Sequence, residues 1–171
     1  MKKIIITYAW AIWCWKSPIT NYISTKLWLP TFNTDSIRSE VCEDFLKYDE
    51  KEAQKRIRER YTSIIKEWKS FILDASVDRK RQTLKEVLKE NGYKCFIISI
   101  DLDKETLFDF YKVKSYTDSI KMIDKVYEDH QKFLMEFSDD INLHINVNNY
   151  KERLDIVYKA ANKRIKEKVE L

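Results

Sequence analysis

The first residues with clear chemical potential are a lysine and a serine placed after a short apolar run. The pair Lys16-Ser17 follows the β-branched run Ile4–Tyr8 and precedes a segment with helical apolar spacing. A Lys-Ser pair closes the phosphate-loop pattern G-x-x-x-x-G-K-[ST], which lies between a strand and a helix. In the same alignment Trp10 and Trp15 occupy the two glycine places of the pattern. The spacing therefore predicts a phosphate site, but with bulky residues where small ones are usual.

Two carboxylates follow later apolar runs. Asp35 comes shortly after the run Leu29–Phe32 and has Arg38 three residues beyond it, and Asp74 directly ends another short run. In an open α/β sheet the ligand lies beyond the carboxyl ends of the strands, so both carboxylates are candidates for a site. Each also has a plain structural explanation. Thr34 or Asp35 is the expected N-cap of the following helix, and Asp74 could simply end a strand.

Strand and helix signals alternate along the whole chain. The apolar patterns predict strands at 4–8, 29–32, 71–73, 95–100 and 141–147. They predict helices at 17–27, 36–47, 50–67, 81–90, 103–137 with a break around 115–117, and 150–169. This alternation favours the α/β class, as a doubly wound parallel sheet of about five strands with helices on both faces. We expect one domain over residues 1–171.

Composition and charge fit a cytoplasmic monomer. Hydrophobic residues make up 44% and charged residues 35%, and the net charge of +4 is spread along the chain. Three widely spaced cysteines match neither a disulfide framework nor a zinc pattern, which indicates a reducing compartment.

The basic start and the apolar run 4–15 resemble a signal peptide, but the run is too short to span a membrane and no small-x-small cleavage site follows. A strand and a loop explain it better, and we expect no membrane partner. His130 is expected to be solvated and His144 to be a satisfied, buried or half-buried side chain.

Short motifs in a fixed order resemble those of a known family. After Lys16-Ser17 come Asn33-Thr34-Asp35-Ser36-Ile37-Arg38 and then Glu67-Trp68-Lys69-Ser70-Phe71-Ile72-Leu73-Asp74. Over about residues 2–168 the chain resembles a small P-loop kinase of the polynucleotide-kinase and zeta-toxin-like group of AAA-type ATP-binding proteins. The resemblance implies a P-loop NTPase fold and ATP- and Mg²⁺-dependent phosphorylation of a hydroxyl. It also implies acceptor-site helices at about 36–69 and a lid at about 110–118.

The resemblance also implies a role for each matching residue. Lys16 would contact the β- and γ-phosphates, while Ser17 and Asp74 would hold Mg²⁺ and its water shell. Asp35 would accept the proton of the attacking hydroxyl, and Arg38 would orient the acceptor. The implied nucleotide-binding segment consists of Trp10, Ala11, Ile12, Trp13, Cys14, Trp15, Lys16, Ser17 and Pro18. The family's lid usually carries arginines, whereas this chain offers Lys112 and Lys114, with Arg79 and Arg81 as rival donors.

The tryptophans are the main departure from the family pattern. The chain has 5 Trp and 1 Gly, and positions 10, 13, 15, 28 and 68 all fall where the family most often has glycine. Some bacterial lineages read the codon UGA as glycine, so one hypothesis is that these positions are glycine in the native protein. A phosphate loop needs positive φ and little side-chain bulk, so indoles there should strain the backbone and block the phosphate. The alternative is a catalytically dead P-loop scaffold that uses an aromatic patch as a protein-interaction module. The acceptor stays open among nucleic-acid ends, nucleotide sugars and small molecules.

Overall fold

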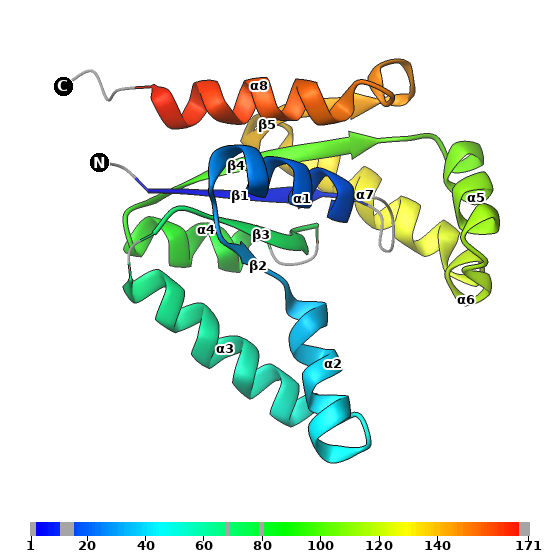
Figure 1. Ribbon diagram of the computed structural model, residues 1–171. Helices are drawn as coiled ribbons and strands as arrows, with labels where there is room; N and C mark the ends of the chain where they lie inside the picture. The colour runs from blue at the N-terminus through cyan, green and yellow to red at the C-terminus, as the bar shows by residue number, and fades with distance from the viewer. Residues whose placement is uncertain (1–2, 11–15, 68, 79–80, 168–171) are drawn as a thin grey trace.

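The computed structural model describes residues 3–10, 16–67, 69–78 and 81–167. These residues form a five-stranded sheet in which all neighbouring strands are parallel, in the order β2-β3-β1-β4-β5 (Figure 1). The strands are β1 (Lys3–Ala9), β2 (Thr31–Phe32), β3 (Phe71–Ser76), β4 (Tyr93–Asp101) and β5 (Ile141–Asn146). The predicted α/β class and the parallel sheet are confirmed.

The helices fall close to the segments predicted from apolar spacing. They are α1 (Lys16–Leu27), α2 (Thr34–Phe45), α3 (Glu50–Lys66), α4 (Arg81–Glu90), α5 (Lys104–Val113), α6 (Thr117–Lys121), α7 (Ile123–Phe137) and α8 (Arg153–Lys166). Two 3₁₀ turns, Ser138–Asp140 and Val147–Asn149, flank β5. α4 ends before Gly92, whose φ of 70° is the left-handed turn expected there. Within the described ranges, no helix is both long and apolar enough to cross a bilayer.

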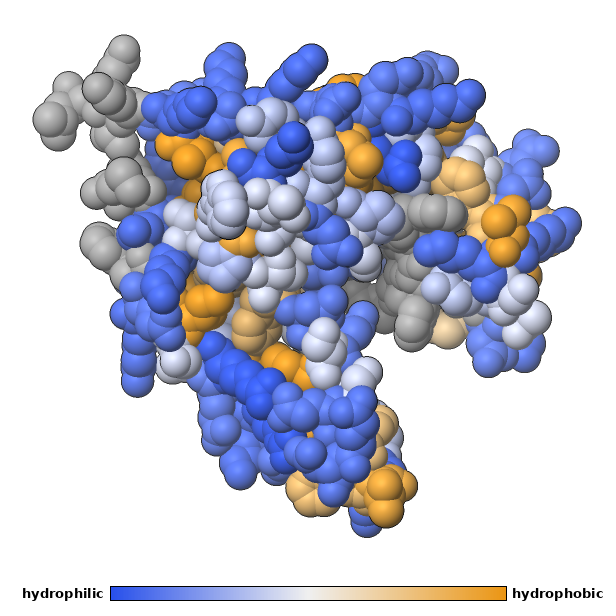
Figure 2. Space-filling model, viewed as in Figure 1, coloured by the Kyte–Doolittle hydropathy of each residue, from blue (hydrophilic) through white to orange (hydrophobic). Residues whose placement is uncertain are grey.

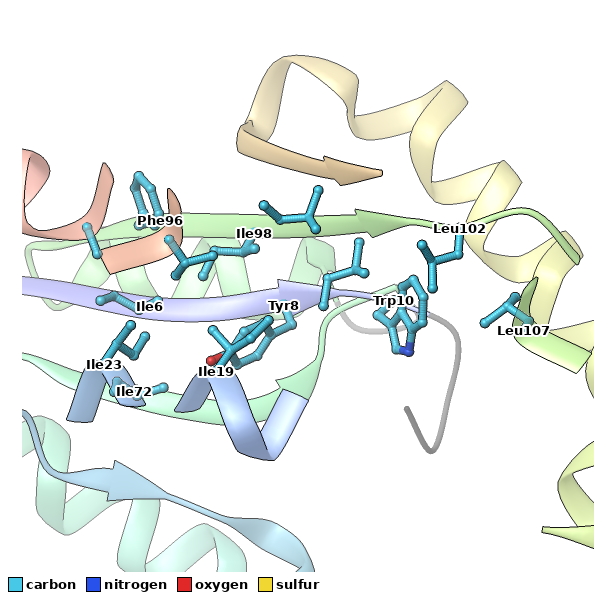
Figure 3. Packing of buried hydrophobic residues seen from close by; sticks show 14 of the residues in the cluster. Ile6, Tyr8, Trp10, Ile19, Ile23, Ile72, Phe96, Ile98, Leu102 and Leu107 are labelled. Carbon is cyan, nitrogen blue, oxygen red and sulfur yellow. The ribbon is translucent and has the colours of Figure 1, made fainter. Parts of the chain in front are cut away.

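Both faces of the sheet are buried, as the continuous apolar strands require. Along β1, Ile4, Ile6 and Tyr8 pack on one face beneath α1 and α8 (Figure 3), whereas Ile5 packs on the other face with side chains of α3 and α4. Because β1 lies at the centre of the sheet, its carboxyl end lies between those of β3 and β4. Residues that follow these strands therefore gather at one edge.

α2 and α3 form an arm that extends away from the sheet (Figure 1). Ion pairs join the two helices. The Arg56 guanidinium contacts Glu40 at 2.6 Å and Asp44 at 2.5 Å, and Arg60 contacts Glu40 at 2.6 Å. The chain turns between the helices at Leu46, which has a left-handed φ of 53°, and Asp49 caps α3. The arm is thus held as a unit beside the carboxyl ends of β2 and β3.

Candidate active site

A cavity opens between the arm and the carboxyl edge of the sheet. It encloses about 380 Å³ and is lined by residues of α1, β2, α2, α3, β3 and α4. Lys16, Asp35, Arg38 and Asp74, which the sequence singled out, all contribute to its lining. Figure 2 shows apolar side chains in the hollow between the arm and the body of the molecule. The structure therefore gathers four residues from separate segments in a space of the size that small ligands occupy.

Asp74 is a buried carboxylate on the sheet side of this cavity. Asn33 donates a hydrogen bond from Nδ2 to Asp74 Oδ2 at 3.1 Å. Asp74 Oδ1 is buried without a hydrogen-bond partner among the described residues. Burial raises the pKa of the Asp74 carboxyl, and the charge of Lys16 and the hydroxyl of Thr20 only partly oppose this effect. A buried carboxylate oxygen without a partner is costly, which suits a group that meets a cation or its water shell.

Asn33, not Thr34 or Asp35, caps α2, so the predicted cap is wrong. Asn33 Oδ1 accepts hydrogen bonds from the backbone N–H groups of Asp35 and Ser36, at 2.8 and 3.2 Å. Asn33 thereby links the start of α2 to Asp74. Asn is a favoured N-cap residue, so Asn33 could have been predicted as the cap from the sequence.

Because Asn33 makes the cap, the Asp35 side chain is free for another role. The carboxylate is 78% exposed and forms an ion pair with Arg38 Nη1 at 2.9 Å, and Arg38 also donates to Thr34 Oγ1 at 3.3 Å. The plain explanation of Asp35 as a helix cap therefore fails. Its carboxylate lies at the cavity with a guanidinium beside it.

The first turn of α1 provides the other end of the site. Lys16, Ser17 and Pro18 begin this helix, with Lys16 half-buried at the cavity and the other two exposed. A helix N-terminus favours anions through its free N–H groups and its dipole. Residues 11–15 of the predicted phosphate loop, with Ala11, Ile12, Trp13, Cys14 and Trp15, lie outside the described residues, as does Trp68.

The residue that opens the predicted loop is held at both of its backbone polar groups. The N–H of Trp10 donates to Asp78 Oδ1 at 2.9 Å, and the carbonyl of Trp10 accepts from Ser76 Oγ at 3.0 Å. Ser76 Oγ also lies 2.9 Å from Asp78 Oδ1 and shares its single proton between the two acceptors. The segment after β3 therefore fixes the point where the chain leaves β1.

Asp78 also contacts His130, a histidine that the sequence analysis expected to be solvated. His130 is 2% exposed, so the expectation of a solvated side chain is wrong. Its Nδ1 lies 3.1 Å from Asp78 Oδ2, and its Nε2 lies 3.1 Å from Asp101 Oδ1. The two carboxylates raise the pKa of His130 to about 9 although burial opposes this. Asp101 also contacts His144, a half-exposed residue, at 2.6 Å.

The two described tryptophans behave differently. The Trp10 side chain is 1% exposed and packs edge-on against His130, with ring centroids 6.2 Å apart. It lies near Leu102 and Leu107 (Figure 3), and its Nε1 is buried without a partner among the described residues. Trp10 is not among the described residues with positive φ, so the expected backbone strain is not found there. Trp28 does have a positive φ of 54°, just past the end of α1, and is 89% exposed.

The predicted lid residues do not share one position. Lys112 Nζ lies over the ring of Phe108 at 4.2 Å, and Lys114 Nζ lies over Tyr116 at 5.6 Å. Arg81 is buried, and its Nε donates to Asp140 at 3.1 Å. Arg79 lies outside the described residues. None of the three described candidates lines the cavity.

Comparison with known proteins reveals the fold. No family model matches the sequence, and no curated protein matches it. A candidate kinase from Chloroflexus aurantiacus superposes with a TM-score of 0.66 at 12% identity over 96% of each chain. Shikimate kinase from Bacteroides thetaiotaomicron gives a TM-score of 0.56 at 13% identity over 98% of this chain and 99% of that one.

A third structure is less completely matched. A chain of the PezAT toxin-antitoxin system of Streptococcus pneumoniae gives a TM-score of 0.54 at 17% identity, over 80% of this chain and 64% of that one. This chain therefore covers less than two thirds of the PezAT chain. At such identities the likeness concerns the fold alone. The chain has the α/β P-loop NTPase fold that is found in kinases.

Proposed function

We propose that this protein is a phosphotransferase that uses ATP and Mg²⁺ to phosphorylate a hydroxyl group of an acceptor. The observation that carries the proposal is the meeting of Lys16, Asp35, Arg38 and Asp74 at one cavity. Phosphoryl transfer needs positioned oxygens and charge compensation more than covalent chemistry by the protein. The motif order further supports a polynucleotide-kinase or zeta-toxin-like member of the P-loop kinases. We expect a cytoplasmic, monomeric, single-domain protein with the α2–α3 arm as its acceptor side.

The residues present fit Mg²⁺. This cation prefers hard oxygen ligands and keeps several waters, and Asp74 offers a carboxylate oxygen without a protein partner. The exposed hydroxyl of Ser17 would be a direct ligand. When bound, the cation would neutralise charge on the phosphates.

The remaining roles follow from the position of each side chain. Lys16 would bind the terminal phosphates, and Arg38, which lies 2.9 Å from Asp35 Oδ1, would hold that carboxylate oriented. The acceptor oxygen forms a bond to the terminal phosphorus of ATP while the bond from that phosphorus to the bridging oxygen breaks. ADP leaves, and the hydroxyl proton moves to Asp35. The lysines of the 110–118 segment and Arg81 would reach the phosphates only after a rearrangement.

Two variants of the chain with glycine at the five tryptophan positions separate binding from chemistry. Lys16→Ala should abolish ATP binding measured by calorimetry, because it removes the point charge at the phosphates. Asp35→Asn should keep ATP affinity and lower turnover by about 10²-fold or more, since general-base assistance is typically worth 10²–10⁴. Glu167→Gln is a matched control, because Glu167 also pairs with an arginine three residues away, Arg164, far from the cavity. Turnover by Asp35→Asn equal to that of the control would remove the proposed base.

The second candidate function is a dead scaffold that binds a protein partner. The burial of the Trp10 side chain in the core favours the scaffold, because the structure accommodates a tryptophan at this position. The coding DNA separates the two candidates: UGA at the five positions supports the enzyme, and UGG supports the scaffold. The mass of the tryptic peptide 4–16 from the native host, which contains three of the five positions, gives the same answer at the protein level.

A further inference from the structure

The walls of the cavity are largely apolar, although charged residues lie at its catalytic end. Its apolar lining residues come from β2, α3, β3, the residue after β3, and α4: Phe32, Ile57, Tyr61, Leu73, Ala75, Val77, Leu84 and Val87. Phe32 and Tyr61 pack edge to face, with ring centroids 5.6 Å apart at 67°. The hydroxyl of Tyr61 is buried, so the residue can offer the cavity only its ring. The body of the acceptor would therefore lie against apolar and aromatic surface.

The charges of the lining are few and balanced. Lys16 and Arg38 stand against Asp35 and Asp74, and the other polar lining residues are the neutral Thr34, Gln54, Ser76 and Thr83. Arg38 is already paired with Asp35. Among the lining residues that the structure describes, no cation is left over for a phosphate or carboxylate on the acceptor. A polyol would also need several convergent hydrogen-bond partners, whereas most lining side chains from β2, α3, β3 and α4 are apolar.

The arm does not offer a track for a nucleic-acid backbone. Such a track needs several basic side chains that are available to phosphates. On the inner side of the arm, Arg56 and Arg60 are engaged by Glu40, Asp44 and Glu52 instead. These two arginines of the arm are therefore already paired with carboxylates.

From these observations we propose that the acceptor is a small alcohol with an uncharged, planar apolar body. This inference rests on the proposed function and narrows it. The body would lie between α3 and α4, and the hydroxyl would point toward Asp35 and Lys16. Transfer proceeds as described above, with ATP as the phosphoryl donor.

The test measures acceptor binding and phosphorylation separately. Tryptophol and 2-phenylethanol serve as apolar probes, glycerol and sorbitol as polyols, and a 5′-hydroxyl oligodeoxynucleotide as the polymer. Binding is followed by NMR titration without nucleotide, and phosphorylation by transfer from labelled ATP with Mg²⁺. Each assay uses the chain as printed and a chain with glycine at the five tryptophan positions. We expect the apolar alcohols to bind, to shift the resonances of Leu84 and Val87, and to be phosphorylated in preference to the others.

Wall variants connect binding to this cavity. Leu84→Asn should weaken tryptophol binding by roughly tenfold, because it replaces apolar contact by a polar group. Leu143→Asn changes another partly buried leucine, on β5, and should leave probe binding unchanged. The nearly isosteric Val87→Thr, with Val113→Thr on the surface as its control, gives the same comparison if Leu84→Asn does not fold.

The outcomes are distinct. Phosphorylation of sorbitol or of the oligonucleotide without binding of the apolar probes would overturn this inference and leave the proposed kinase function standing. The absence of probe binding at the cavity would overturn it as well. Probe binding that the wall variants weaken, in a chain with glycine at the five positions that binds no ATP, would support the apolar site and contradict the kinase function.

Discussion

The buried imidazole of His130 makes a quantitative prediction about stability and pH. In the folded protein Asp78 and Asp101 raise its pKa from 6.5 to about 9, a difference that corresponds to about 3 kcal/mol. Because the folded pKa is the higher one, this stabilisation is fully present below about pH 6.5 and is lost as the pH rises through about 9. His130→Gln should therefore destabilise the protein by about 3 kcal/mol more at pH 6 than at pH 10.

Urea unfolding at the two pH values measures this difference, and subtracting the variant from the parent removes the contribution of the titrating groups that do not interact with His130. His144→Gln is the control, since this half-exposed histidine also contacts Asp101 but leaves the buried imidazole in place. It should retain the pH-dependent loss. A parent-to-variant difference for His130→Gln that is equal at both pH values, or larger at pH 10, would refute the assignment of a buried, charged imidazole.

Two further predictions concern single positions. Asp74→Asn should remove most Mg²⁺-dependent turnover. Thermal melting at pH 7 should nevertheless find the free protein at least as stable, because the raised pKa of Asp74 means that its buried charge is unfavourable in the free protein. A clear loss of stability would contradict this reasoning. Trp28→Gly should stabilise the protein by about 0.5–1 kcal/mol, or a Tm increase of roughly 2–3 °C, because the relief of the left-handed conformation exceeds the added flexibility of the unfolded chain. Lys26→Gly, inside α1, should instead destabilise the protein by about 1 kcal/mol. A loss of stability in both variants would mean that the Trp28 side chain makes stabilising contacts.

Most of the fold could be predicted because its signals are local. The helix over Arg81–Glu90 is bounded by its own apolar spacing and by Asn91-Gly92, and the structure has the same bounds. The short β2 was predicted at 29–32 but covers only Thr31–Phe32, since an edge strand pairs only as far as its neighbour allows. The ends of a strand thus depend on the strand with which it pairs, and local sequence patterns do not specify that pairing.

The site could be predicted only in part, for the same reason. Lys16, Asp35 and Asp74 follow predicted strands, so the sheet topology was enough to bring them to one edge. The pairing of His130 with Asp78 and Asp101 joins groups 52 and 29 residues apart in the chain, and no local pattern marks it. Likewise, the apolar wall between α3 and α4 depends on how the arm packs.

The contrast between Trp10 and Trp28 bears directly on whether glycine belongs at these positions. Trp28 is exposed and left-handed, so glycine there would relieve the backbone and lose little contact. Trp10 fills a buried space beside His130, and removal of a buried tryptophan typically costs about 3–5 kcal/mol through the cavity left behind. However, its buried Nε1 has no partner among the described residues, which itself costs about 1–3 kcal/mol. The packing energies at the two positions thus oppose each other, and stability alone cannot decide between the hypotheses. The mass of peptide 4–16 decides it, because that peptide contains position 10, where the packing argument for tryptophan is strongest.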